Sequence, residues 1–215
     1  MQLTLPKALT IENLEALRTA LNEKDDFVLI KGYSDPLFCG GADLVFLLEA
    51  KKSELKKFFF LLVDVLLTLY GYKGIVVCNV SGAAVGGGVG FVAVADIVTG
   101  SETFRWKLSE VQLGFGPYVI SPFLNARIGY SSLIEIAISG RWVSFQESVS
   151  MGLVSDTNID VSQLHNPWLR LAKKLFKPKI EKRIFRDLVA NVVVAVCSRA
   201  VREKVSQLAS ERRKS

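Results

Sequence analysis

The stretch Ser81-Gly-Ala-Ala-Val-Gly-Gly-Gly-Val-Gly90 decides how this chain folds. Five of its ten residues are glycine, and the apolar run Ile75–Val80, which is typical of a buried strand, precedes it. Residues 91–95 after the glycines read as helix. Because glycine costs conformational entropy, a chain tolerates such a run where its backbone approaches something closely. A strand, a glycine turn and a helix start also bring free N–H groups to one point, which suits a negatively charged oxygen.

Strand and helix patterns alternate along the rest of the chain. Phe27–Lys31 is typical of a buried strand, and Thr10 is typical of the cap of a helix over residues 11–22. Residues 38–43 form a second glycine-bearing loop that opens a helix. Further strands are predicted at residues 3–5, 96–99 and 103–108, and further helices at residues 55–70, 131–139 and 144–151. This alternation predicts an α/β fold with a largely parallel sheet.

Composition limits the classes of site that the chain can hold. Its 215 residues suit one domain of ordinary size, and half of them are hydrophobic, which is enough for a large core. The three cysteines, Cys39, Cys78 and Cys197, are far apart and odd in number, so they predict neither a disulfide framework nor a metal site. The single histidine, His165, excludes a histidine-rich metal site and argues against a Ser-His-Asp triad. The first residues do not resemble a signal peptide, so we expect a reduced, cytoplasmic compartment.

The net charge of +6 is unevenly distributed, because residues 173–215 hold 13 Lys and Arg against 4 Asp and Glu. A basic segment of this kind can contact nucleic acid, an anionic membrane surface or the phosphates of a small ligand. A solvated helix face is the simplest explanation, since Ile184, Leu188 and Val192 recur at helical spacing. The segment has only two aromatic residues, Phe176 and Phe185, which gives little support to nucleic-acid binding.

Residues 74–95 carry no charge, and their number is enough for a membrane-spanning helix. The polar Asn79 and Ser81 and the glycine-rich run oppose that interpretation, as does the lack of an aromatic belt at both ends. A strand buried on both faces and followed by a buried helix accounts for the same pattern. We therefore expect no membrane span.

Several motifs, taken in order, resemble those of the crotonase superfamily, the enoyl-CoA hydratase/isomerase fold. They are Leu5-Pro-Lys-Ala-Leu-Thr10, Phe38-Cys-Gly-Gly-Ala-Asp-Leu44, the glycine stretch 81–90, Asp96-Ile97, Ser109-Glu-Val-Gln-Leu-Gly-Phe-Gly-Pro117, Ile128-Gly129, Ser139-Gly-Arg141 and Gly152-Leu-Val154. The resemblance covers nearly the whole chain. It implies a ClpP/crotonase-like fold of repeated ββα units, with residues 1–165 as a core that holds the oxyanion loops and the acyl-CoA site. Residues 166–215 would form a helical, basic region for oligomerisation.

The same resemblance implies an oxyanion hole made of two backbone N–H groups, those of Ala42 and Gly87. Two such donors would bind the thioester carbonyl of an acyl-CoA and stabilise the enolate-like oxygen that forms during reaction. The substrate-binding residues that it implies, or that lie around the expected site, are Gly41, Asp43, Gly86, Gly88, Phe115, Pro117 and Tyr118. Asp43 is also placed to cap the helix that follows it. Phe104 and Trp106 are further candidates for an apolar acyl pocket, although each suits core packing as well.

Glu110 is the catalytic candidate, because its segment resembles the one that carries a catalytic glutamate in the superfamily. A partly desolvated carboxylate has a raised pKa, which suits the transfer of a proton at carbon. The alternative is an exposed loop glutamate with no role in chemistry.

Position 90 departs from the pattern of the two-carboxylate hydratases, whose first acid stands three residues after the hole glycine. This chain has Gly90 there. Three functions remain open: hydration of a 2-enoyl-CoA by Glu110 alone, which we favour, isomerisation of a 3-enoyl-CoA with Glu110 as proton shuttle, and binding of acyl-CoA without turnover. We expect no cofactor beyond the CoA of the substrate and no metal. We also expect a homotrimer or hexamer.

A dinucleotide-binding enzyme is the competing class, because Gly88-Val-Gly-Phe-Val-Ala93 satisfies G-x-G-x-x-A. In that fingerprint the glycines should follow the strand immediately, whereas residues 81–87 intervene here. The match is therefore weak.

Overall fold

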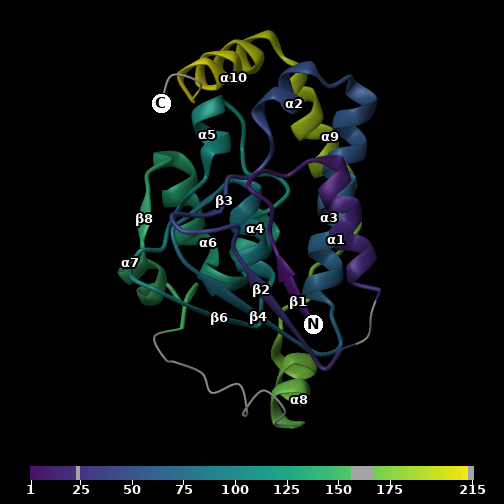
Figure 1. Ribbon diagram of the computed structural model, residues 1–215, viewed down its shortest axis with the longest axis vertical. Helices are drawn as coiled ribbons and strands as arrows, with labels where there is room; N and C mark the ends of the chain where they lie inside the picture. The colour runs from purple at the N-terminus through teal and green to yellow at the C-terminus, as the bar shows by residue number, and fades with distance from the viewer. Residues whose placement is uncertain (23–24, 156–166, 213–215) are drawn as a thin grey trace.

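The computed structural model describes residues 1–22, 25–155 and 167–212, in which two sheets are surrounded by helices (Figure 1). The first sheet has the strand order β1-β2-β4-β6, and all of its pairs are parallel. Its strands are β1 (Gln2–Thr4), β2 (Phe27–Lys31), β4 (Ile75–Val80) and β6 (Ile97–Gly100). The largely parallel sheet that the alternating pattern predicts is confirmed.

The second sheet has the order β3-β5-β7-β8 and is parallel except for its last pair. Its strands are β3 (Leu37–Cys39), β5 (Ala83–Val85), β7 (Arg105–Lys107) and β8 (Val143–Ser144). The chain passes from β4 of the first sheet to β5 of the second through Gly82, which has φ +63°. A Cβ atom there would lie 2.2 Å from the carbonyl oxygen of Pro36, so only glycine fits this crossing.

Ten helices are present in the described residues. They are α1 (Ile11–Ala20), α2 (Leu44–Glu49), α3 (Lys52–Tyr70), α4 (Gly87–Val94), α5 (Ser109–Leu113), α6 (Ser121–Ser139), α7 (Phe145–Ser150), α8 (Pro167–Phe176), α9 (Ile184–Cys197) and α10 (Arg199–Arg212). Helix α3 packs against α1, α4 and α9, and α10 packs against α2 and α9. In Figure 1, α10 and α5 lie at one end of the molecule and α8 lies at the other.

Helix α4 lies in the centre of the core, because seven of its eight residues are buried. The uncharged stretch of residues 74–95 therefore forms the buried strand β4, the short strand β5 and the buried helix α4. No helix in the described parts of the chain is long and apolar enough to cross a membrane.

Some boundaries differ from those that the sequence predicts. Helix α4 begins at Gly87, four residues before the predicted start, because tertiary packing overrides the low helix propensity of glycine. Helix α6 begins at Ser121, ten residues early, with Pro122 in its first turn and a break at Gly129, whose φ is 76°. Glu110, for which an exposed loop position was the alternative, lies on the short helix α5. His165 lies outside the described residues.

Candidate active site

The first loop of the site follows β3 and is fixed against Leu9 by two backbone hydrogen bonds. The N–H of Leu9 donates to the carbonyl oxygen of Gly41 (2.7 Å), and the N–H of Asp43 donates to the carbonyl oxygen of Leu9 (3.1 Å). Leu9 and Ala42 are paired in a parallel bridge. In such a bridge the hydrogen bonds of Leu9 go to the residues before and after Ala42, so the N–H of Ala42 points away from Leu9. It has no acceptor among the described residues.

The second loop follows β5 and leads into α4. The N–H of Gly86 donates to the carbonyl oxygen of Lys107 (3.0 Å), and Gly86 has φ 51°, a conformation that favours glycine. Gly87 is the first residue of α4, where a backbone N–H has no partner within the helix. In the described part of the chain no other group accepts from it. The positive end of the α4 dipole lies at the same point.

Two glycines bring these loops into backbone contact. A Cβ atom on Gly41 would lie 2.6 Å from the carbonyl oxygen of Val85 and 3.2 Å from the nitrogen of Gly87. A Cβ atom on Gly88 would lie 2.6 Å from the carbonyl oxygen of Cys39. The neighbours of Ala42 and of Gly87 are therefore packed together, and the two unpartnered N–H groups belong to adjoining loops.

Glu110 lies beside the second loop. A Cβ atom on Gly86 would lie 3.1 Å from its Oε1 atom and 3.0 Å from the Oγ atom of Ser109. The other carboxylate oxygen, Oε2, is buried and has no hydrogen-bond partner among the described residues. Burial raises the pKa of Glu110 from 4.5 to about 7, so that both protonation states are populated near neutral pH. A carboxyl group with this pKa can both accept and donate a proton.

The space beside Gly90 is filled by apolar side chains. A Cβ atom there would lie 2.8 Å from the Cγ2 atom of Ile120 and 3.0 Å from the Cδ1 atom of Leu66. Of the described residues that line the cavity, Glu110 is the only carboxylic acid. In the described residues no three His, Cys, Asp or Glu side chains are grouped so that they could hold a metal ion.

An apolar cavity contains the groups of both loops and Glu110. Its lining includes Ala42, Gly86, Gly87 and Glu110 together with apolar side chains of several helices. Those side chains are Leu44, Leu47, Phe58, Phe59, Leu62, Leu113, Phe115, Val119, Ile120, Val192 and Leu208. Val192 and Leu208 come from α9 and α10, so the C-terminal helices of the same chain close the cavity.

A second hollow also borders Ala42. It shares Gly40, Ala42 and Leu44 with the cavity and is also lined by Lys7 and Asp43. Lys7 is exposed. A ligand with two arms could therefore place one arm in each hollow and its centre at the N–H of Ala42.

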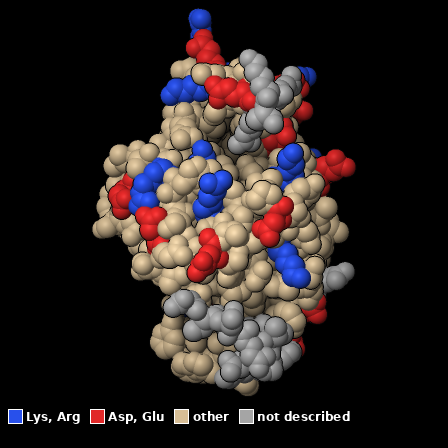
Figure 2. Space-filling model, turned by 60° about the vertical axis from the view of Figure 1, so that its left-hand side comes forward, with Lys and Arg blue, Asp and Glu red and all other residues tan. Residues whose placement is uncertain are grey.

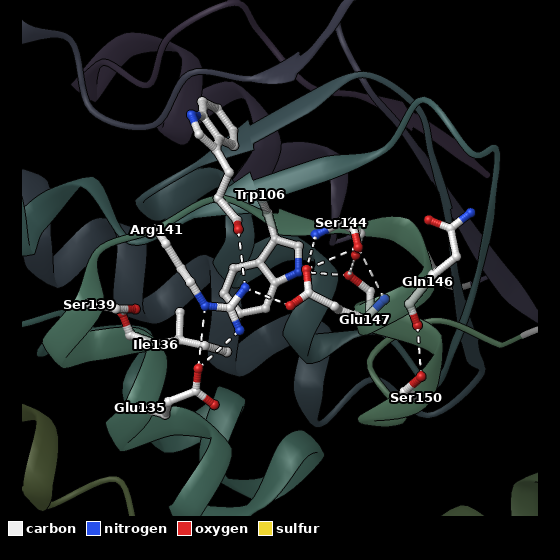
Figure 3. Close-up of polar contacts among 11 residues, drawn as sticks. Trp106, Glu135, Ile136, Ser139, Arg141, Ser144, Gln146, Glu147 and Ser150 are labelled. Atoms are coloured by element: carbon white, nitrogen blue, oxygen red, sulfur yellow. Dashed lines mark hydrogen bonds and ion pairs between the residues drawn. The ribbon is translucent and has the colours of Figure 1, made fainter.

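The strand that leads into α5, β7, is joined to α7 by a side-chain hydrogen bond (Figure 3). The buried indole N–H of Trp106 donates to the Oγ atom of Ser148 (2.9 Å). On the neighbouring surface, Arg141 forms ion pairs with Glu135 of α6 (3.0 Å) and Glu147 of α7 (2.6 Å). Exposed ion pairs contribute at most about 1 kcal/mol each. The hydrogen bond of Trp106, by contrast, is buried and joins β7 to α7.

The structure brings together six of the residues that the sequence singled out: Ala42, Gly86, Gly87, Glu110, Phe115 and Tyr118 line the cavity. Gly41 and Gly88 instead allow the loops to touch, and Pro117 is buried outside the lining. Asp43 caps α2, because its Oδ1 atom accepts from the N–H of Phe46 (2.9 Å). Phe104 and Trp106 are core residues.

Other lining residues were not predicted from the sequence. The polar ones are Lys107, Ser109 and Gln112, which flank Glu110 in the chain. Ser109 and Gln112 belong to the motif segment 109–117, which is a signal that could have found them, and Lys107 lies two residues before it. Phe58, Phe59 and Leu62 have the apolar spacing of α3, but that spacing does not tell a cavity wall from a core face.

Comparison with known proteins places this geometry in a family. The family model described as enoyl-CoA hydratase/isomerase matches residues 3–212. The bacillaene synthase dehydratase PksH of Bacillus subtilis is 27% identical over 179 residues, which are 82% of this chain and 69% of PksH. The human chromodomain Y-like protein is 28% identical over 145 residues, which are 65% of this chain and 24% of that protein.

Solved structures share the fold along nearly the whole chain. An enoyl-CoA hydratase from Bacillus halodurans superposes with a TM-score of 0.81 at 19% identity, and the match covers 96% of this chain and 95% of that one. An enoyl-CoA hydratase from Mycobacterium avium superposes with a TM-score of 0.78 at 18% identity over 98% of this chain and 90% of that one. The predicted crotonase-like α/β fold is confirmed. The chain belongs to the enoyl-CoA hydratase/isomerase family.

Proposed function

We propose that the protein catalyses the reversible addition of water to a 2-enoyl-CoA thioester. The observation that carries the proposal is the position of Glu110. Its enclosed Oε2 atom has no hydrogen-bond partner in the described chain. Its Oε1 atom lies against Gly86, and the next residue, Gly87, has a backbone N–H without an acceptor among the described residues. A proton-transfer group thus adjoins a pair of backbone donors in an apolar cavity. Membership of the family agrees with this arrangement.

In the proposed mechanism the N–H groups of Ala42 and Gly87 donate to the thioester carbonyl oxygen. They withdraw electrons from the conjugated system and make the β-carbon electrophilic. Glu110, as carboxylate, takes a proton from water while the hydroxide adds to the β-carbon, and negative charge moves to the carbonyl oxygen. The protonated Glu110 then gives that proton to the α-carbon, the enolate collapses, and the product is a 3-hydroxyacyl-CoA. One residue acts first as base and then as acid.

The two hollows beside Ala42 suit the two arms of the thioester. The acyl chain would occupy the apolar cavity, and the pantetheine arm would leave through the hollow lined by Gly40, Asp43 and Lys7. An ammonium group at the edge of that hollow would attract a CoA phosphate. No cofactor other than the CoA of the substrate is required.

Isomerisation is the second candidate, and the packing around Gly90 favours it. Ile120 and Leu66 fill the space where a second acid would stand, so no second carboxylate from this position can hold a water. A single glutamate can remove a proton from the α-carbon of a 3-enoyl-CoA and return it to the γ-carbon, which moves the double bond into conjugation. The name of the relative PksH, a dehydratase, supports hydration and its reverse instead.

We also propose that copies of the chain associate, as a trimer or hexamer, in the cytoplasm. Tyr130, Ile134 and Ile138 are exposed and lie four residues apart on α6, which gives that helix an apolar face toward solvent.

Ultraviolet absorbance of the conjugated enoyl thioester tests the proposed reaction. With crotonyl-CoA the absorbance should fall as the double bond is hydrated. A rise with 3-hexenoyl-CoA and no change with crotonyl-CoA would make the protein an isomerase. Tight binding with no change for either substrate would favour a protein that holds acyl-CoA without turnover.

A further inference from the structure

Helix α8 is attached to the rest of the protein largely through its basic side. The Nζ atom of Lys173 lies 2.6 Å from the Oδ2 atom of Asp96 and donates to the carbonyl oxygen of Gly74 (2.8 Å). Arg170 forms an ion pair with Asp26 (2.6 Å). No residue of α8 is buried. These charged groups orient the helix together with the partly buried Leu169, which packs against Ile75 and Val77 of β4.

The apolar side of α8 faces outward. Trp168, Leu171 and Leu175 lie at positions i, i+3 and i+7, which places them on one face of the helix. Their exposed fractions are 55%, 47% and 60%, and the fraction for Phe176 at the end of the helix is 69%. In Figure 2, Lys, Arg, Asp and Glu are spread over the middle and upper parts of the visible face.

Cations outnumber anions where α8 meets the core. Lys173 and Lys177 share the single carboxylate of Asp96, each at 2.6 Å, and the guanidinium of Arg127 donates to the backbone oxygen of the same residue (3.2 Å). The side chains of Lys173, Lys177 and Asp96 are only 11–16% exposed. Three positive groups thus surround one carboxylate, and the excess positive charge has little solvent to screen it.

This cluster opens into a hollow with further cations around it. The hollow is lined by six basic side chains, Lys73, Arg170, Lys173, Lys174, Lys177 and Lys179, and by one acidic side chain, Glu181. Arg170 and Lys174 belong to α8 itself, so the positive rim directly adjoins the exposed apolar face. An apolar strip beside a positive hollow suits a surface that offers both hydrocarbon and phosphate.

We propose that α8 and the adjoining positive hollow attach the protein peripherally to an anionic lipid bilayer. Trp168, Leu171 and Leu175 would enter the boundary between headgroups and acyl chains. The exposed cations of the hollow, Lys73, Lys174 and Lys179, would contact anionic headgroups. A second copy docked through the same face would bring two positive rims together, which opposes self-association there. The proposal concerns the end of the molecule opposite α10 and α5 and is independent of the reaction at Glu110.

Sedimentation of the full-length protein with vesicles tests this attachment. Vesicles of phosphatidylcholine alone are compared with an equimolar mixture of phosphatidylcholine and phosphatidylglycerol. We expect binding to the mixed vesicles only, and we expect Leu171→Ser to lower it about tenfold. Lys174→Gln should lower it about fivefold. The matched controls are Val194→Ser and Lys56→Gln, which alter exposed residues on α9 and α3 and should leave vesicle binding unchanged.

Several outcomes would overturn the proposal. Wild type that stays in the supernatant with both vesicles, or that binds both equally, would show that no anionic surface is recognised. Equal losses in the control variants would show non-specific adsorption. Light scattering without vesicles provides a separate readout: if Leu171→Ser lowers the molar mass in solution, the apolar face of α8 is an interface between copies. Unchanged circular dichroism would show that each variant is folded.

Discussion

Gly90 and Ile120 are packed so closely that a Cβ atom on Gly90 would lie 2.8 Å from the Cγ2 atom of Ile120. Ile120 also lines the cavity, and hydrocarbon from Ile120 and Leu66 fills the space beside Gly90. The proposed chemistry must therefore be carried out by one acid and two backbone donors. It also explains why a glycine is needed in the middle of the buried helix α4.

Substitution of Gly90 tests this packing. Gly90→Ala should lower the free energy of unfolding by about 1–3 kcal/mol because of overpacking, although alanine alone would favour the helix by up to about 1 kcal/mol. The penalty should shrink in an Ile120→Ala background, where the Cγ2 atom is gone. Urea unfolding of the two single variants and the double variant measures the coupling. Equal penalties in both backgrounds would contradict the contact.

The raised pKa of Glu110 predicts a specific dependence of stability on pH. Between pH 4.5 and about 7 an unfolded glutamate has lost its proton while the buried Glu110 retains it, so the folded state binds more protons. The free energy of unfolding contributed by this group therefore falls as the pH rises through that window and is constant above it. Glu110→Gln removes the ionisation. The free energy of unfolding of Glu110→Gln, relative to that of wild type, should therefore rise by about 1–3 kcal/mol as the pH rises from 4.5 to about 7.

Urea unfolding at a series of pH values measures this difference. The exposed Glu102→Gln serves as a control for the loss of a carboxylate. A constant difference between wild type and Glu110→Gln from pH 4.5 to 7 would contradict the burial of the Glu110 carboxyl group.

The wall formed by α10 should set the length of the acyl chain. Leu208→Ala removes a side chain that lines the cavity, so longer enoyl chains should gain relative to crotonyl-CoA. The ratio of kcat/KM for long over short substrates should rise about tenfold, the usual effect of one or two methylene groups in an apolar pocket. Ser206→Ala, an exposed position on the same helix, is the control. An unchanged ratio would remove Leu208 from the acyl site.

Lys7 should contribute to recognition of the CoA moiety. Lys7→Ala removes a cation from the hollow beside Ala42, and KM for crotonyl-CoA should rise by up to about fivefold, as for an exposed ion pair. The N-acetylcysteamine thioester, which has no phosphate, should show no change. Equal effects on both thioesters would mean that Lys7 acts on the fold rather than on the phosphates.

Local pattern and motif resemblance predicted much of the framework. The strands β2 and β4 have the predicted bounds, and α1 begins after Thr10, whose side chain accepts from the N–H of Asn13. These elements are long or carry a capping signal, so local sequence determines them. The strand β5 and the helix α5 were missed because three and five residues are too few for a hydrophobic period to be recognised.

The site was predictable where a motif carried it and unpredictable where distant contacts build it. Ala42, Gly87 and Glu110 belong to such motifs, and all three line one cavity. Val192 and Leu208 join them only because α9 and α10 fold back over residues far earlier in the chain. Nothing in the local sequence distinguishes these two side chains from ordinary core residues.

The most direct test of the central claim is the rate of crotonyl-CoA hydration by wild type and Glu110→Gln, measured by ultraviolet absorbance. A general acid–base group contributes about 10²–10⁴ in rate, so the variant should lose kcat by that factor. It should still bind the unreactive butyryl-CoA, since the N–H groups of Ala42 and Gly87 remain in place. A variant that hydrates crotonyl-CoA at the wild-type rate would contradict the assignment of Glu110 as the catalytic acid and base.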